Sequence, residues 1–184
     1  SAVAEKLFDN NMRDVFTILV LLCPTVAFAQ LDFEREPILY SKSQPTDRVA
    51  VLSKRLDSGD VKLNWESEHG YLASLLKELD VPVSSQTLVF SKTGLQVARI
   101  SPQKPRAVYF TDDIYVGWVQ HGDLIEVSAV DSLLGATFYT LPQIKTETQR
   151  LKRETSRCLQ CHGSTHTRRI PGHIVRSVHA DKSG

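Results

Sequence analysis

Apolar residues recur at helical spacing in two stretches of the first half of the chain. The first, residues 48–56, predicts a short helix that Gly59 closes as a C-terminal cap. The second, residues 64–80, places apolar side chains on one face and charged ones outside it, and Pro82 follows it. The apolar positions of this second predicted helix are Leu72, Leu75, Leu76 and Leu79.

Past residue 85 the apolar period changes to two, which is typical of strands. Five such stretches are rich in β-branched and aromatic residues: 86–91, 107–111, 114–119, 124–130 and 136–141. Residues 120–123 and 131–135 fit hairpin loops between neighbouring strands. The chain therefore predicts an α+β fold, in which N-terminal helices precede an antiparallel sheet.

The segment after Pro142 is polar and has no sustained periodicity. Residues 145–184 hold nine Lys and Arg against three Asp and Glu, whereas residues 1–144 hold thirteen against eighteen. We therefore expect an α+β domain at residues 30–144 and a basic C-terminal arm at 145–184. The net charge of +1 gives no reason to expect a nucleic-acid partner.

Residues 1–29 have the pattern of a secretory signal peptide preceded by upstream residues. Met12 and Arg13 precede an apolar run that ends in Ala27-Phe28-Ala29, so we expect translation to start at Met12 and cleavage to fall before Gln30. A buried helix or a membrane anchor is the alternative, but the run is short for a bilayer and contains Pro24. The mature protein is expected to be periplasmic or secreted, without a stable membrane span.

Cleavage before Gln30 leaves two cysteines, Cys158 and Cys161, with His162 directly after the second. Free thiols do not persist in an oxidising compartment, so this pair is bridged, metal-bound or joined to a cofactor. The C-x-x-C-H spacing is that of c-type haem attachment. Two thiols at this spacing can form thioethers with one edge of a porphyrin, and the histidine then supplies an axial nitrogen to the iron.

Three other interpretations of the pair remain. A thioredoxin-like redox motif would place the cysteines at the start of a helix after a central strand, whereas here a charged stretch precedes them. A structural zinc site would combine both cysteines with two of His166, His173 and His179. A local disulfide across so short a loop is strained.

Several stretches resemble a family of secreted bacterial proteins described as cytochrome-c-like or haem-binding. The resemblance spans about residues 63–183 and rests on GYLASLLKELDVPVSSQTLVFSKTGLQ, PRAVYFTDDIYVGWVQHG, GATFYTL, CLQCHG and IPGHIVRSV. It implies an exported protein with one covalent haem c, attached at Cys158 and Cys161 and ligated by His162. It implies no substrate. Members of the family continue past the point where this sequence ends, so we expect a truncated C-terminus.

The sixth iron ligand separates the possible functions. The mature chain contains no methionine, and His173, which follows a Pro171-Gly172 turn, is the first candidate for this position. A strong sixth ligand favours electron transfer with a redox partner protein, and the basic arm suggests an acidic partner. An open position favours a haem enzyme, such as a peroxidase or small-molecule reductase, or a haem sensor. We assign no catalytic residue.

Two further features have plain structural interpretations. Asp112 and Asp113 lie between two predicted strands, where paired acids most often form a turn. Aromatic residues at strand positions are expected in the core or in cross-strand pairs, although some of them could cover a haem face. These residues are Tyr109, Phe110, Tyr115, Trp118, Phe138 and Tyr139.

Overall fold

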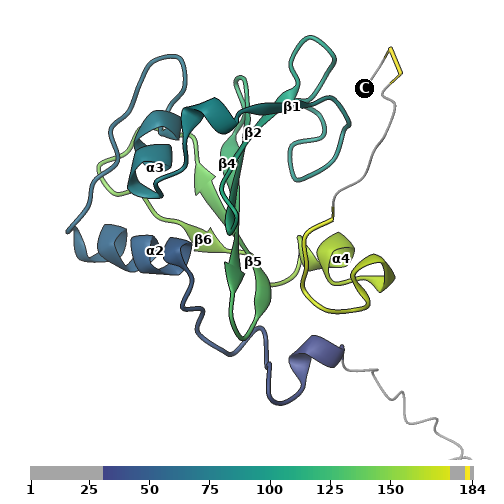
Figure 1. Cartoon of the computed structure of the whole chain (residues 1–184). Coiled ribbons are helices and arrows are strands. Elements are labelled where there is room, and N and C mark those ends of the chain that lie inside the picture. Colours follow the sequence, from purple (N-terminus) through teal and green to yellow (C-terminus); the bar gives the residue numbers. More distant parts are fainter. Residues whose placement is uncertain (1–30, 175–180, 183–184) are drawn as a thin grey trace, which may run out of the picture. The chain divides into compact units, whose positions relative to one another are not determined.

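A computed structural model describes residues 31–174 and 181–182, and within them the chain is an α+β fold built on one antiparallel sheet (Figure 1). The six strands pair in the order in which they occur in the chain. They are β1 (Thr87–Val89), β2 (Arg106–Phe110), β3 (Ile114–Val119), β4 (Leu124–Asp131), β5 (Gly135–Pro142) and β6 (Lys152–Arg153). The predicted signal peptide lies outside the described residues.

The five predicted strands are confirmed. Strands β2 and β4 alternate buried and less buried positions, whereas β5 is buried along most of its length. The predicted turn at Asp112 and Asp113 is also confirmed. There the Thr111 amide donates to the Ile114 carbonyl at 2.9 Å, and the Thr111 hydroxyl donates to the Asp113 carboxylate at 2.7 Å. Strand β6 was not predicted, since a two-residue strand carries no periodicity.

Helix α2 (Arg48–Ser58) begins where predicted and ends at Gly59, whose φ of 81° is the left-handed conformation expected of a C-terminal cap. Its N-cap is Asp47, whose carboxylate accepts hydrogen bonds from the amides of Val49 and Ala50. The remaining short helices are η1 (Asp32–Glu34), α3 (Leu72–Glu78), η2 (Val83–Ser85), α4 (Leu159–His162) and η3 (Thr165–Thr167).

The prediction of a helix over residues 64–80 was wrong in its first half, because α3 begins only at Leu72. Glu66 and Gly70 instead form an isolated antiparallel bridge through their backbone groups. Gly70 has a φ of 63°, and a Cβ there would lie 1.9 Å from the side-chain oxygen of Gln143. This contact with a residue beyond the sheet fixes a turn where local sequence alone favours a helix.

The sheet buries two cores of different size on its two faces. Helices α2 and α3 cover one face, and α4 lies on the opposite side, which we call the second face (Figure 1). The large core contains the leucines of α3 together with Ile114, Val116, Ile125 and Val127 from the strands. The small core, on the second face, comprises Phe33, Tyr40, Leu134, Ala136, Phe138 and Leu159.

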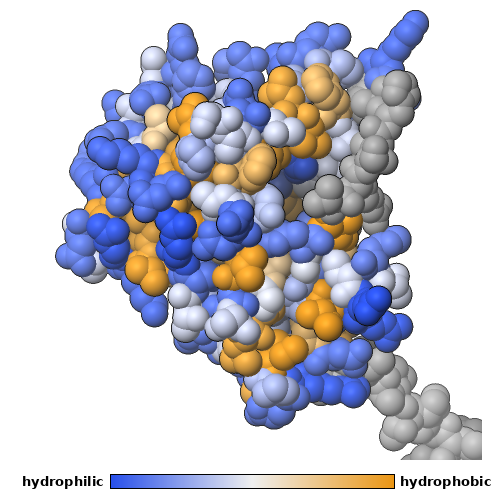
Figure 2. Space-filling model, viewed as in Figure 1, coloured by the Kyte–Doolittle hydropathy of each residue, from blue (hydrophilic) through white to orange (hydrophobic). Residues whose placement is uncertain are grey.

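Hydrophobic side chains also reach the surface. Figure 2 shows them gathered over the β1–β2 end of the sheet, where Leu88, Phe90 and Phe110 are each at least two-fifths exposed. Within residues 31–174 and 181–182, no helix is both long and apolar enough to cross a bilayer.

Candidate functional site

The C-x-x-C-H motif forms the short helix α4 with Cys158 as its N-cap. The Cys158 carbonyl accepts hydrogen bonds from the amides of Cys161, at 3.3 Å, and His162, at 2.9 Å. Cys158, Cys161 and His162 therefore belong to one helical turn, in which residues three and four positions apart are neighbours. Both cysteines are free thiols; Cys158 is half-buried and Cys161 exposed.

Leu159 docks this turn on the second face, where it is buried in the small core with Phe138. Gly163 ends the turn against Phe33: a Cβ at Gly163 would lie 2.8 Å from the Phe33 ring. The chain just after the predicted signal cleavage thus packs against the motif some 125 residues later, a contact that sequence analysis missed.

A buried carboxylate holds the segment that leads into α4. The Glu154 side chain is only 4% exposed and accepts hydrogen bonds from Thr140, at 3.1 Å, and from Arg157 Nε, at 3.0 Å. The hydrogen bond from Arg157 outweighs burial and lowers the pKa of Glu154. Arg153 donates to the carbonyls of Tyr40 and Ser43. Two basic residues of the predicted arm are therefore engaged in structural contacts.

The imidazole of His162 is held by a backbone carbonyl. Its Nδ1 lies 3.0 Å from the Gly172 oxygen, and the Gly172 amide donates to the His162 carbonyl at 2.9 Å. A carbonyl can only accept, so Nδ1 carries a proton, and in the neutral imidazole Nε2 then has a free lone pair. The ring packs on Phe138, with 4.7 Å between centroids. This tautomer is the one that a metal-binding histidine uses.

The loop formed by residues 163–173 folds back onto the sheet. The Pro171 carbonyl accepts a hydrogen bond of 2.9 Å from the Ala136 amide on β5. Nε2 of His173 shares a hydrogen bond of 2.9 Å with the Ser128 hydroxyl on β4, and its ring packs on Tyr115 at 4.6 Å. Burial lowers the pKa of His173, and the neighbouring His162 adds to this effect.

Tyr115, Ser128 and Phe138 are direct neighbours across β3, β4 and β5 on the second face. The two histidines therefore lie over one row of the sheet. Of the aromatic residues predicted to pack or to cover a haem, Tyr109 and Tyr139 belong to the large core. Phe138 and Tyr115 lie beside the motif and its loop.

The cysteines differ from those of a thiol oxidoreductase. Burial, together with the carboxylates of Glu126 and Glu154, raises the pKa of the Cys158 thiol to about 12. A redox-active C-x-x-C pair depends on a lowered thiol pKa. Cys158 therefore stays a neutral thiol at neutral pH, which disfavours the thioredoxin-like interpretation.

Of the three histidines considered for a zinc site, the structure describes His166 and His173 but not His179. His166 is exposed on η3, and His179 lies outside the described residues. Among the residues that the structure does describe, no three His, Cys, Asp or Glu side chains converge so that they could hold a metal ion.

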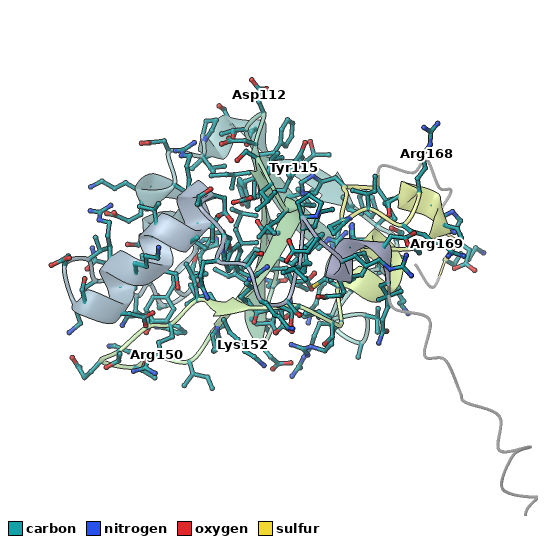
Figure 3. The ribbon with its side chains drawn as sticks, turned by 90° about the horizontal axis from the view of Figure 1, so that it is seen from below. Asp112, Tyr115, Arg150, Lys152, Arg168 and Arg169 are labelled. Atoms are coloured by element: carbon teal, nitrogen blue, oxygen red, sulfur yellow. The ribbon has the colours of Figure 1, made fainter. Side chains whose placement is uncertain are left out.

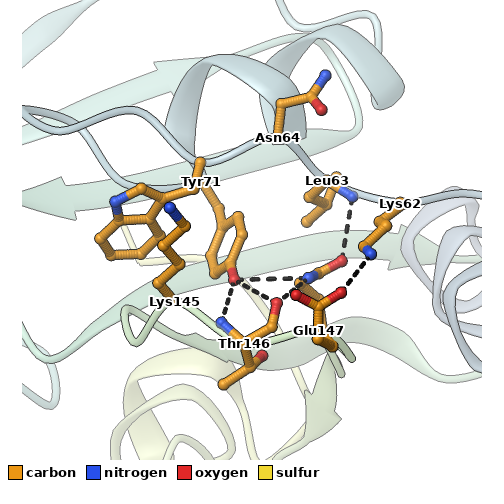
Figure 4. A pocket seen from close by; sticks show the side chains of 9 residues that line it. Lys62, Leu63, Asn64, Tyr71, Lys145, Thr146 and Glu147 are labelled. Atoms are coloured by element: carbon orange, nitrogen blue, oxygen red, sulfur yellow. Dashed lines mark hydrogen bonds and ion pairs between the residues drawn. The ribbon is translucent and has the colours of Figure 1, made fainter.

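A separate pocket of about 400 Å³ lies between residues 62–71 and 145–149 (Figure 4). The Tyr71 hydroxyl, which accepts a hydrogen bond from the Thr146 amide, and the ion pair of Lys62 with Glu147 at 2.7 Å form part of its lining. Cys158, Cys161 and His162 are not among its lining residues. These polar groups already satisfy one another, so the pocket is a weaker candidate than α4.

No family model, curated protein or solved structure matches this chain.

Proposed function

We propose that this protein is an exported c-type cytochrome, with haem attached covalently to Cys158 and Cys161 and with His162 as the axial ligand. The observation that carries the proposal is the hydrogen bond from His162 Nδ1 to the Gly172 carbonyl. It fixes the ring and leaves Nε2 available, an arrangement that a histidine without a metal partner does not require.

The residues present fit a covalently bound haem. The thiols are unbridged and belong to the same helical turn as His162. Leu159 of the motif packs with Phe138 in the small core, so the motif has an apolar support. When bound, haem supplies an iron that exchanges one electron at a time.

The protein's own residues then have distinct tasks. Cys158 and Cys161 hold the group in place, and His162 ligates the iron. The Gly172 carbonyl orients the imidazole, while Phe138 excludes water from one side of it.

We further propose that the redox partner is an acidic protein. Arg168 and Arg169 are exposed and point outward from the segment that follows α4, well apart from Arg150 and Lys152 (Figure 3). Both positive charges are close in sequence to the motif, and an acidic surface that docks there would pair with them.

A haem sensor or enzyme with an open iron position is the second candidate. The hydrogen bond between His173 Nε2 and Ser128 favours this candidate. His173 is the predicted sixth ligand, and this bond engages the nitrogen with which it would bind iron.

Expression with a cytochrome c maturation system tests the attachment. We expect the haem to stay with the polypeptide in acid acetone, to be released when Cys158→Ala and Cys161→Ala are combined, and to lose its native spectrum in His162→Ala. His166→Ala serves as the matched histidine control, because His166 is exposed in the same segment. Stoichiometric zinc without haem in protein from its native source contradicts the proposal.

A further inference from the structure

Gly172 lies behind His162, on the side away from Nε2. Both of its backbone groups bond to His162: the carbonyl to Nδ1 at 3.0 Å and the amide to the carbonyl oxygen at 2.9 Å. In an imidazole, Nδ1 and Nε2 point in nearly opposite directions. A metal bound at Nε2 is therefore on the far side of the ring from Gly172.

This placement bears on His173, the next residue in the chain. From the Gly172 oxygen, a ligand nitrogen on the opposite side of the iron would lie about 9 Å away, given metal–nitrogen bonds of about 2 Å. The His173 side chain reaches at most about 7 Å from the same oxygen, even when fully extended. It would also have to pass around the porphyrin. His173 cannot bind the same iron while Gly172 holds His162.

The contacts of His173 indicate a different task. The residues on either side of Gly172 are both anchored to the sheet, Pro171 through the Ala136 amide on β5 and His173 through the Ser128 hydroxyl on β4. The His173 ring also packs on Tyr115. These two anchors, on adjacent strands, determine where the Gly172 carbonyl points.

We propose that His173 is a positioning residue on the same side of the haem as His162, and not the sixth ligand. Its bond to Ser128 keeps the Gly172 carbonyl on His162 Nδ1. A hydrogen bond at Nδ1 makes the imidazole a stronger donor, and stronger donation stabilises ferric over ferrous iron. The Ser128–His173 contact therefore lowers the reduction potential of the haem. This inference rests on the proposed function.

The test uses the haem-loaded full chain and three variants of this contact: His173→Ala, Ser128→Ala and the conservative His173→Gln. We expect His173→Ala and Ser128→Ala to raise the midpoint potential by similar amounts, and His173→Gln to recover part of the shift. The spin state and the reactivity towards carbon monoxide should stay those of the unmutated protein in all three. His166→Ala, in the same loop, should leave the potential unchanged.

Two results overturn the inference. One is a change from low-spin to high-spin iron, with new carbon monoxide binding, in His173→Ala, since this would identify His173 as the sixth ligand. The other is an unchanged potential in both His173→Ala and Ser128→Ala.

A second measurement decides the inference without haem. In ¹⁵N-labelled protein, the His162 Nδ1 proton should exchange slowly with solvent, and this protection should be lost in Ser128→Ala and His173→Ala. Retained protection in both variants contradicts the positioning role. If the unmutated protein binds no haem, the proposed function fails, and this measurement still tests the role of Ser128 and His173.

Discussion

The hydroxyl group of Tyr139 donates a hydrogen bond of 2.6 Å to Asp47, a buried carboxylate that also caps helix α2. Thr137 donates to the same carboxylate oxygen at 2.9 Å, and the amides of Val49 and Ala50 donate to the other oxygen. Burial, together with the negative charge of Asp47, raises the pKa of Tyr139, so its hydroxyl stays protonated and donates. One side chain thus joins the start of α2 to the sheet.

We expect Asp47→Ala to lower the free energy of unfolding by about 3 kcal/mol, because it removes a helix cap and leaves the buried Tyr139 hydroxyl without its acceptor, whereas Thr137 can still donate to the Ala129 carbonyl. Urea denaturation followed by circular dichroism measures this. Asp57→Ala is the control, since Asp57 forms an exposed ion pair with Arg150 and should change stability by about 0–1 kcal/mol. A loss below about 1 kcal/mol for Asp47→Ala would show that water replaces these contacts.

The second prediction concerns the contact between Gly163 and Phe33. A methyl group at Gly163 would lie 2.8 Å from the Phe33 ring and 3.1 Å from the Leu159 carbonyl, so Gly163→Ala should destabilise the fold by about 1–3 kcal/mol. Thermal unfolding and the haem content per polypeptide both report the effect.

Phe33→Leu provides the matched test, because it makes room for the methyl group. In the double variant, the cost of Gly163→Ala should be smaller than in the unmutated background. Strict additivity of the two substitutions would mean that Phe33 and Gly163 do not touch in solution.

Asp131 makes stability depend on pH. Burial by itself would raise the pKa of Asp131, but hydrogen bonds from the amides of Thr46, Leu134 and Leu133 outweigh it, so its pKa is lowered. A carboxyl with a lowered pKa in the folded state stabilises the protein above its unfolded pKa of about 4, and this stabilisation is lost as the pH falls through the folded value.

The measurement for Asp131 compares unfolding free energies at pH 7 and pH 3. The unmutated protein should lose more stability between these values than Asp131→Asn, which should be less stable at pH 7 by about 1–2 kcal/mol. Asp112→Asn, an exposed position in another turn, is expected to follow the unmutated protein. An equal pH dependence for Asp131→Asn would assign the acid sensitivity to other carboxyl groups, such as Glu154.

The sequence by itself determined the parts of the fold that depend on local periodicity. Strand β3 occupies the predicted residues, and α2 starts at Arg48 and ends at Gly59, because alternation and capping are properties of neighbouring residues. The sequence also predicts that Cys158, Cys161 and His162 lie close together, because they are at most four positions apart in the chain. The helical pattern predicts too early a start for α3, because the turn at Gly70 is packed against the side chain of Gln143, which is distant in the sequence.

Only the tertiary structure decided how the motif is supported. Residues 163–173 have no periodicity, and their path is set by hydrogen bonds to Ser128 and Ala136 on the sheet. The sequence predicts that His173 follows a turn that could reverse the chain, but it does not predict which side of the His162 ring the turn approaches. The bond between His162 Nδ1 and the Gly172 carbonyl shows that the turn lies on the Nδ1 side of the ring. Such a bond joins groups ten residues apart, and packing against the sheet, not local preference, brings them into contact.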